Sequence, residues 1–263
     1  MIERSATGAA LAISIALAAW RIRLLTAGGA AVATLIGTLA VAAGWQWGIL
    51  LILFFVASST LSAAAGKRHA PAVRDIVDKR GARDAVQVLA NGSVFAAAAA
   101  GSVLWPHDVW SAAGLGALAA ATADTWGTEI GSMARGEPRL FTTWRSVPTG
   151  TSGAVSPAGL AATACGAAFI AGAAMSLGWG STLAAAALAG GLAGAASDSL
   201  LGATVQQRRR CETCAMETEQ RIHRCGTQTH VIGGLAWLEN DAVNLFCTFV
   251  GAAVAAALSL RPA

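Results

Sequence analysis

Runs of about 20 weakly polar residues recur along the whole chain and constrain its fold more than any other feature. The chain is 55% hydrophobic and only 12% charged, whereas charged residues make up about 25% of a typical soluble domain. In a bilayer every backbone polar group must be hydrogen-bonded within the protein, so apolar runs of this length predict membrane-spanning helices. The expected fold is an all-α polytopic membrane protein, with residues 1–263 forming one transmembrane domain.

The apolar runs predict eight transmembrane helices. Ala and Gly dominate them, so the helices are expected to pack closely through small-residue contacts. No cleavable signal sequence is expected, because the first apolar stretch lacks a small-residue cleavage site. The predicted spans are residues 6–20, 24–43, 46–65, 85–105, 110–134, 155–176, 182–206 and 231–260.

Basic residues fall on alternate connections between these spans. The connections around residues 21–23, 66–84, 135–145 and 208–224 hold 16 of the 18 Lys and Arg residues, and the turns between them hold none. The positive-inside rule then makes the basic side cytoplasmic and places both termini outside, in the inner (plasma) membrane. The net charge of +4 reflects this loop bias, so no nucleic-acid partner is predicted.

Carboxylates inside the spans are the next constraint, because an acid at mid-bilayer costs roughly 2.5–3.5 kcal/mol and usually faces a polar interior. Asp124 and Glu129 lie on the fifth span, and Asp198 and Asp241 lie on the last two. At about 1.5 Å per residue, the three Asp residues fall about 13–15 Å below the cytoplasmic edge. Glu129 and Asn91 fall about 8–9 Å below it. This shared depth predicts one site built by four helices.

Helical spacing refines this site. Asp198 shares one face with glycines at 190, 194 and 202, so a neighbouring helix can approach that face closely. Asp241 shares a face with Trp237, Asn244 and Thr248. Five residues rotate by about 140° on a straight helix, so Asp124 and Glu129 do not share a face. Either the helix opens at the intervening glycine, or the two acids serve different partners.

Several carboxylate and amide oxygens at one point are the ligands of a hard cation. Mg²⁺ is typically held by one or two carboxylates together with substrate phosphates. We therefore expect three Asp residues to bind Mg²⁺, and Glu129 to act as a second metal ligand or an orienting group. The predicted catalytic set is Asp124, Glu129, Asp198 and Asp241, with Asn240 and Asn244 completing the metal shell.

The basic loops on the same side carry small hydroxyl residues and glycines, whose hydroxyl and backbone N–H groups can bind phosphate oxygens. The sequence contains no G-x-x-x-x-G-K-[ST] motif, which excludes a P-loop. The predicted substrate-binding residues are Lys67, Arg80, Arg83, Asn91, Thr143, Arg145, Thr149, Gly150, Thr151 and Ser152.

A Cys/His loop over residues 207–230 is a separate feature. It contains a C-x-x-C pair followed by H-x-C, which have the ligand types and closeness of a structural Zn²⁺ site. The predicted ligands are Cys211, Cys214, His223 and Cys225. The alternative is a set of reduced cytosolic thiols.

Four stretches in order resemble a large family of integral membrane proteins, which includes the plant phytyl-phosphate kinase of the vitamin E pathway and transmembrane protein 19. The likeness extends from about Lys67 to Asn244, and residues 87–92 and 211–225 resemble bacterial members. The stretches are Ala123-Asp-Thr-Trp-Gly-Thr-Glu-Ile-Gly131, Thr142-Thr143 with Val147 through Ser156, Asp198-Ser-Leu-Leu-Gly-Ala-Thr204 and Trp237-Leu-Glu-Asn-Asp-Ala-Val-Asn244.

The resemblance implies an enzyme that phosphorylates a prenyl monophosphate to the diphosphate with a nucleoside triphosphate such as CTP. Two alternatives remain. A cytidylyltransferase acting on a lipid phosphate would use the same metal and lipid site. A transporter or flippase would use the acids as ion-coupling sites, but it would place polar groups toward both sides of the membrane.

Overall fold

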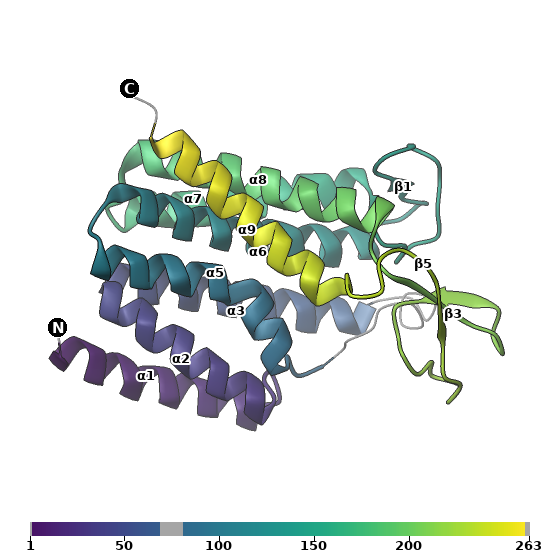
Figure 1. Ribbon diagram of the computed structural model, residues 1–263, viewed down its shortest axis with the longest axis horizontal. Helices are drawn as coiled ribbons and strands as arrows, with labels where there is room; N and C mark the ends of the chain where they lie inside the picture. The colour runs from purple at the N-terminus through teal and green to yellow at the C-terminus, as the bar shows by residue number, and fades with distance from the viewer. Residues whose placement is uncertain (1, 69–80, 261–263) are drawn as a thin grey trace.

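The computed structural model describes residues 2–68 and 81–260, which contain eight helices and five short strands (Figure 1). The helix axes are roughly aligned with one another, and both termini lie at the same end of the bundle (Figure 1). We call the other end, where the strands lie, the loop end. The helices are α1 Ile2–Arg21, α2 Ala27–Ala43, α3 Trp45–Arg68, α5 Ala85–Leu104, α6 Asp108–Met133, α7 Pro157–Ser176, α8 Gly180–Thr204 and α9 Asn240–Ser259.

Each of the eight predicted spans corresponds to one helix of the described chain. Five helices are long and apolar enough to cross a membrane, namely α3, α5, α7, α8 and α9, and α2 is a shorter apolar helix. Their alternation brings the described basic connections to the loop end (Figure 1). The predicted all-α polytopic architecture is therefore confirmed.

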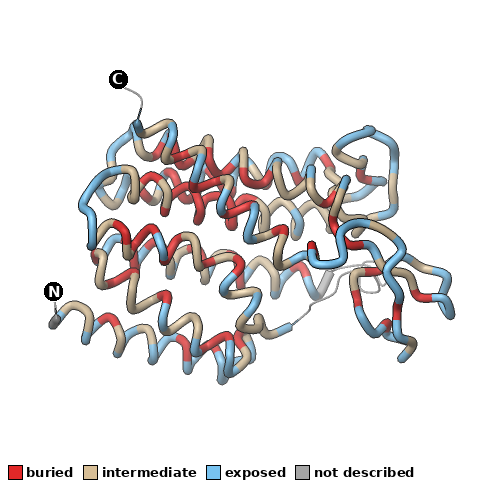
Figure 2. The backbone as a smooth tube through the Cα atoms, viewed as in Figure 1, coloured by how far each residue is buried: buried red, intermediate tan, exposed pale blue. Residues whose placement is uncertain are grey.

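Helix α6 forms the centre of the bundle. It packs against α3, α5, α7, α8 and α9, and all residues from 114 to 123 are buried (Figure 2). Only small and aliphatic side chains fit in a helix that is surrounded in this way, which explains the Ala- and Gly-rich sequence. Asp124 follows directly after this buried stretch, and Glu129 lies five residues further toward the loop end.

Glycines allow the helices around α6 to approach closely. A Cβ atom on Gly194 of α8 would lie 2.5 Å from Ala120 Cβ on α6 and 2.6 Å from the Cys247 carbonyl oxygen on α9. A Cβ atom on Gly202 would lie 2.6 Å from Gly153 N. The small face predicted around Asp198 is thus confirmed as a packing face.

Helix α6 is continuous from Asp108 to Met133, so the first of the two alternatives, an opening at Gly127, is wrong. Gly127 instead allows α7 to come close, because a side chain there would collide with Thr163 Oγ1. Asp124 and Glu129 therefore extend from one regular helix in different directions.

The loop end carries two small sheets. Strands β1 (Arg139–Leu140) and β2 (Ala154–Val155) form a hairpin between α6 and α7. Strands β3 (Arg208–Cys211), β4 (Met216–Thr218) and β5 (His230–Gly233) form an antiparallel sheet between α8 and α9, in the order β4-β3-β5.

The predicted start of the last span, residue 231, is wrong. Residues 230–233 form β5, which pairs with β3, and α9 begins at Asn240. The backbone N–H and C=O groups of this short apolar run form hydrogen bonds with β3 instead of within a helix. Gly234 then adopts a φ of +77°, which does not fit a helix. Asp241 consequently lies in the first turn of α9, not about 15 Å deep.

Candidate functional site

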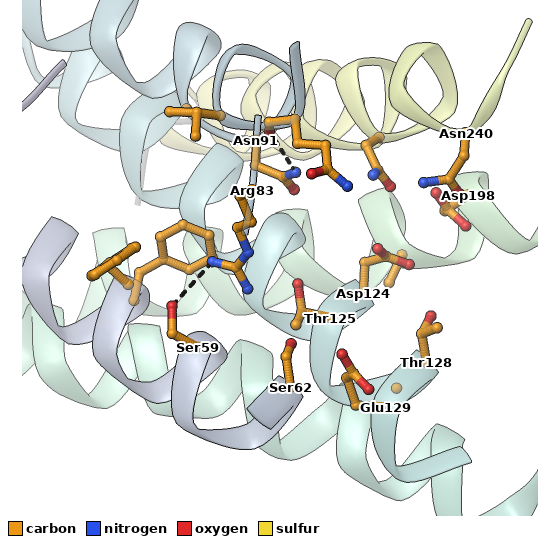
Figure 3. Close-up of a pocket in the computed structure, with 18 of the residues that line it drawn as sticks. Ser59, Ser62, Arg83, Asn91, Asp124, Thr125, Thr128, Glu129, Asp198 and Asn240 are labelled. Carbon is orange, nitrogen blue, oxygen red and sulfur yellow. Dashed lines mark hydrogen bonds between the residues drawn. The ribbon is translucent and has the colours of Figure 1, made fainter. Parts of the chain in front are cut away.

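A cavity of about 1180 Å³ opens between the helices at the loop end (Figure 3). Residues of α1, α2, α3, α5, α6, α7, α8, α9 and the β1–β2 hairpin line it. Among the described residues, its charged lining consists of four carboxylates and two guanidinium groups: Asp124, Glu129, Asp198, Glu219, Arg23 and Arg83. This excess of carboxylates favours binding of a cation.

Asp124 of α6 and Asp198 of α8 form the centre of the site (Figure 3). Their carboxyl groups lie within hydrogen-bonding reach of each other. The Oδ2 atom of Asp198 is buried and has no hydrogen-bond partner among the described residues. Two carboxylates in contact repel each other unless a proton or cation lies between them, so this pair fits a divalent cation.

Glu129 and Arg83 form a second group in the same cavity (Figure 3). Glu129 interacts electrostatically with both Asp124 and Arg83. The Nη1 atom of Arg83 donates a hydrogen bond to Ser59 Oγ at 3.4 Å. Burial lowers the pKa of the Arg83 guanidinium, and the charge of Glu129 opposes this shift.

Glu219 is a site residue that the sequence reasoning missed. It lies in the Cys/His loop after β4, yet it lines the cavity and interacts electrostatically with Asp198. Its Oε1 atom accepts hydrogen bonds from Ser152 Oγ at 2.7 Å and from Gln206 Nε2 at 2.9 Å. No local sequence pattern identifies this carboxylate, because its position depends on a contact with Ser152, which lies 67 residues earlier in the chain.

Amide side chains extend the polar lining. Asn240 and Asn244 of α9 and Asn91 of α5 line the cavity as predicted. The Nδ2 atom of Asn91 donates a hydrogen bond to the Gln87 carbonyl oxygen at 3.0 Å. Gln87 also lines the cavity but was not among the predicted site residues, although its helical spacing from Asn91 was a usable signal.

The described lining of the cavity includes Asp124 and Asp198 but not Asp241, so the metal role of the third aspartate stays a prediction. Asn240 and Asn244, four residues apart on α9, share the cavity face. Trp237, predicted on that face, precedes the helix and is 62% exposed.

Only part of the predicted phosphate-binding loop lines the cavity. This part is residues 149–152. Thr143 and Arg145 lie on the exposed outer part of the β1–β2 hairpin and do not belong to the described cavity lining, so the structure does not bring them together with the carboxylates. Lys67 lies at the end of α3 with a side chain outside the described part, and Arg80 lies outside the described residues.

An apolar groove continues the cavity along α1, α2 and α3 (residues 11–55 of its lining). Ile15 on α1, Ile36 on α2 and Ile52 on α3 lie on its walls. On α3 the apolar part of the lining runs from Phe55 to Trp45 at the end opposite the loops, about 15 Å of helix. This is about half the hydrocarbon thickness of a bilayer, which is about 30 Å. The groove can therefore hold part of an extended lipid chain.

The structure brings together the four predicted zinc ligands, Cys211, Cys214, His223 and Cys225. Hydrogen bonds with Thr227 and His223 lower the pKa of Cys225 to about 6. A hydrogen bond with Cys225 raises the pKa of Cys214 to about 11. At neutral pH the cluster therefore contains both a thiolate and a thiol.

The fold and this site define a polytopic α-helical membrane protein with a carboxylate cluster at one end of its bundle. The chain belongs to the family of integral membrane proteins DUF92, whose model matches residues 10–252. The family membership predicted from the four motifs is thereby confirmed.

Two relatives illustrate the breadth of this family. The chain is 30% identical over 257 residues to Protein PGR of Arabidopsis thaliana, covering 88% of this chain and 87% of that protein. It is 32% identical over 169 residues to the uncharacterized membrane protein MJ0933 of Methanocaldococcus jannaschii, covering 63% of this chain and 67% of that protein. No solved structure matches the chain.

Proposed function

We propose that the protein is a Mg²⁺-dependent kinase that converts a prenyl monophosphate to the diphosphate, using a nucleoside triphosphate such as CTP. The observation that carries the proposal is that one cavity joins a carboxylate pair at the loop end to an apolar groove along three helices. A lipid phosphate has this same division into a charged head and an apolar chain. The resemblance to the phytyl-phosphate kinase family supports the same substrate class.

Metal binding would fall to the carboxylate pair. Asp124 and Asp198 would hold Mg²⁺, with the amide oxygens of Asn240 and Asn244 as further ligands. When bound, Mg²⁺ supplies neutralisation of the phosphate charges during transfer. The unpartnered Oδ2 of Asp198 fits this role, because it is a buried carboxyl oxygen available to a ligand.

The protein's own groups would position the two phosphates. Arg83 would neutralise a phosphate oxygen, and Glu129 would orient Arg83. The stretch 149–152 would donate the Thr149 hydroxyl and backbone N–H groups to the nucleotide phosphates. The prenyl chain would occupy the apolar groove, which holds the acceptor head beside the carboxylates and limits access of water.

The reaction needs no strong general base in this scheme. The acceptor oxygen belongs to a phosphate that is already anionic at neutral pH, so no proton must leave it. A new bond forms between this oxygen and the γ-phosphorus, the bond between the γ-phosphorus and the bridging oxygen breaks, and the nucleoside diphosphate leaves. Catalysis then consists of positioning and charge neutralisation.

The positive-inside rule supports a cytoplasmic orientation of the loop end, since 16 of the 18 Lys and Arg residues lie on the connections predicted there. A nucleoside triphosphate would then reach the site from the cytosol, and the lipid would enter from the bilayer. The polar lining near one end of the bundle argues against a transport pathway, which needs access from both sides.

The test is a direct assay with purified protein, geranylgeranyl or phytyl monophosphate, CTP and Mg²⁺, followed by mass spectrometry of the lipid product. A prenyl diphosphate is expected, whereas a cytidylyltransferase would give a lipid-linked cytidine nucleotide and pyrophosphate. Asp124→Asn should abolish the product, and Asp108→Asn, at the other end of the same helix, should not. Absence of diphosphate with any prenyl phosphate, or full activity in Asp124→Asn, would refute the proposal.

A further inference from the structure

The Cys/His cluster has the geometry of a metal centre. Cys211 ends β3, Cys214 lies in the turn to β4, and the other two ligands lie between β4 and β5. The four ligand atoms lie within 4.8 Å of one another. The Sγ atoms of Cys211 and Cys225 are 3.5 Å apart, and His223 Nδ1 is 3.3 Å from Cys225 Sγ. Tetrahedral zinc holds neighbouring sulfur and nitrogen ligands about 3.5–3.8 Å apart.

The segment around this cluster has almost no hydrophobic core. Between residues 205 and 239, all of which are described, the buried hydrophobic residues are Cys211 and Leu238. Three strands of three or four residues without an apolar face are not stable by burial alone. Small modules of this kind usually depend on a disulfide or a metal, and the cysteines here are free.

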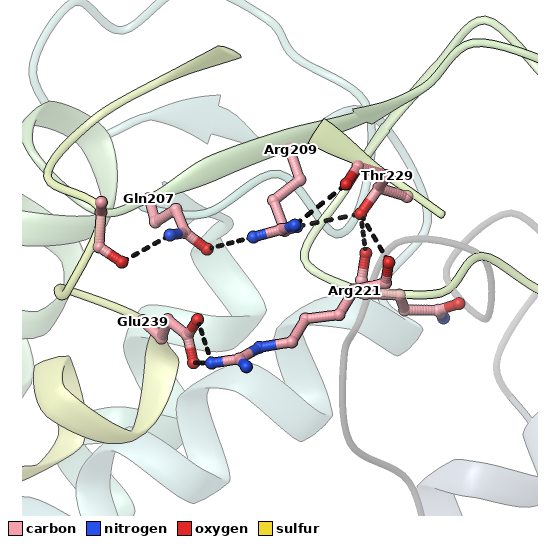
Figure 4. Close-up of polar contacts among 7 residues, drawn as sticks. Gln207, Arg209, Arg221, Thr229 and Glu239 are labelled. Atoms are coloured by element: carbon pink, nitrogen blue, oxygen red, sulfur yellow. Dashed lines mark hydrogen bonds and ion pairs between the residues drawn. The ribbon is translucent and has the colours of Figure 1, made fainter. Parts of the chain in front are cut away.

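A polar network then connects the cluster to the helices (Figure 4). Arg209 Nε and Nη2 donate to the Thr229 Oγ1 and carbonyl oxygen at 2.9 and 3.0 Å, and Arg209 Nη1 donates to Gln207 Oε1 at 3.1 Å. Arg221 Nη2 lies 2.7 Å from Glu239 Oε1, at the start of α9. The segment that carries the cluster is thus fixed against the loop end of the bundle.

Glu219 connects this segment to the cavity. It lies between the second and third residues of the cluster in sequence, five residues after Cys214 and four before His223. Its contacts with Ser152 and Gln206 hold its carboxylate at the cavity wall near Asp198. Any constraint that closes the loop between Cys214 and His223 also restricts where Glu219 can lie.

We propose that Cys211, Cys214, His223 and Cys225 bind one structural Zn²⁺, and that this ion holds Glu219 at the cavity as a positioning device. The metal would join the β3–β4 turn, which carries Cys211 and Cys214, to the segment with His223 and Cys225 between β4 and β5. Its binding free energy would stabilise the segment in place of a hydrophobic core. Zinc occupancy itself does not depend on the kinase reaction, so it can hold or fail independently of the proposed function.

The first test is the metal content of the purified full-length protein, measured by plasma mass spectrometry. About one zinc per chain is expected for the wild type, with loss of zinc in the double variant Cys211→Ser, Cys214→Ser. Cys165→Ser, in α7 and away from the cluster, should retain the metal. Because the double variant can misfold, the wild type is also loaded with Co²⁺, which should give the visible absorption of tetrahedral thiolate coordination. Iron in place of zinc, no metal, or zinc retained in the double variant would overturn the assignment.

The second test addresses the positioning of Glu219. Zinc is removed from the folded wild type with a chelator, the chelator is washed out, and limited trypsin digestion and the Mg²⁺-induced shift in unfolding temperature are measured. Cleavage at Arg221 and Arg224 should increase, and the Mg²⁺ shift should fall to the value found for Glu219→Gln. A zinc-free protein that resists trypsin and keeps the full shift, or a Glu219→Gln variant that keeps it, would refute the positioning role.

Discussion

Neutralising Asp198 is expected to have opposite effects on stability with and without Mg²⁺. The carboxyl groups of Asp198 and Asp124 lie within hydrogen-bonding reach. Two carboxyl groups this close cannot both ionise without a cation, so in the metal-free wild type one proton relieves their repulsion. Asp198→Asn supplies an amide donor to Asp124 in place of this proton, so the metal-free variant should be at least as stable as the metal-free wild type, with a gain of about 0–2 kcal/mol.

Magnesium should reverse this order. At 100 times its dissociation constant, a ligand that binds only the folded state stabilises it by about 2.7 kcal/mol, which corresponds to a rise of roughly 5–11 °C in Tm for a chain of this size. Asp198→Asn loses a charged ligand and should keep little of this increase. The double effect separates a metal site from an ordinary packing contact, which would respond equally with and without Mg²⁺.

The assay follows the intrinsic fluorescence of the nine tryptophans during thermal unfolding in detergent micelles, with EDTA or with increasing Mg²⁺. Asp108→Asn serves as the matched control, because Asp108 lies in the first turn of α6, at the end opposite the carboxylate pair, and does not line the cavity. Equal Mg²⁺ stabilisation of the wild type and Asp198→Asn, or none in the wild type, would refute the reasoning.

Three further predictions test the packing, the α9 phase and the groove. Gly194→Ala should lower the free energy of unfolding by about 1–3 kcal/mol, because its Cβ would lie 2.5 Å from a neighbouring carbon atom; Gly172→Ala, with nothing within 4 Å, should be neutral or stabilising in the same unfolding assay. Asn244→Ala should weaken Mg²⁺ binding, measured by titration of the Tm shift, whereas Asp241→Asn should not, and the reverse result would restore the sequence-based metal set. Ile52→Trp should raise KM for geranylgeranyl monophosphate more than for the shorter geranyl monophosphate, since Ile52 lines the groove far from the carboxylates; equal effects on both would place the chain elsewhere.

The carboxylate pair illustrates how far local sequence reasoning reaches. Asp124 and Asp198 could be predicted as partners because each interrupts an apolar helix at a similar depth, and the cost of burying a charge makes such a coincidence informative. Asp241 satisfied the same criteria only because residues 231–239 were assigned to the helix. Pairing of β5 with β3, a contact between distant segments, keeps residues 230–233 out of α9, which begins at Asn240.

The same distinction applies to the loop end. The cysteine and histidine spacing predicted a cluster, and the structure brings its four ligands together. Glu219 was missed, because its position depends on contacts with Ser152 and Gln206 that no local pattern encodes. Thr143 and Arg145 were misplaced for a related reason, since the β1–β2 hairpin turns them away from the cavity.

The sequence alone determined the eight helices, their alternating direction and the end at which the basic loops gather, because insertion into a bilayer depends on hydropathy and charge within single segments. Only the tertiary structure decided which polar groups meet in the cavity and that an apolar groove continues from it. These arrangements depend on the rotation of each helix about its axis, on strand pairing and on glycine contacts between segments far apart in the chain. The sequence of one helix does not specify how a neighbouring helix is rotated about its own axis.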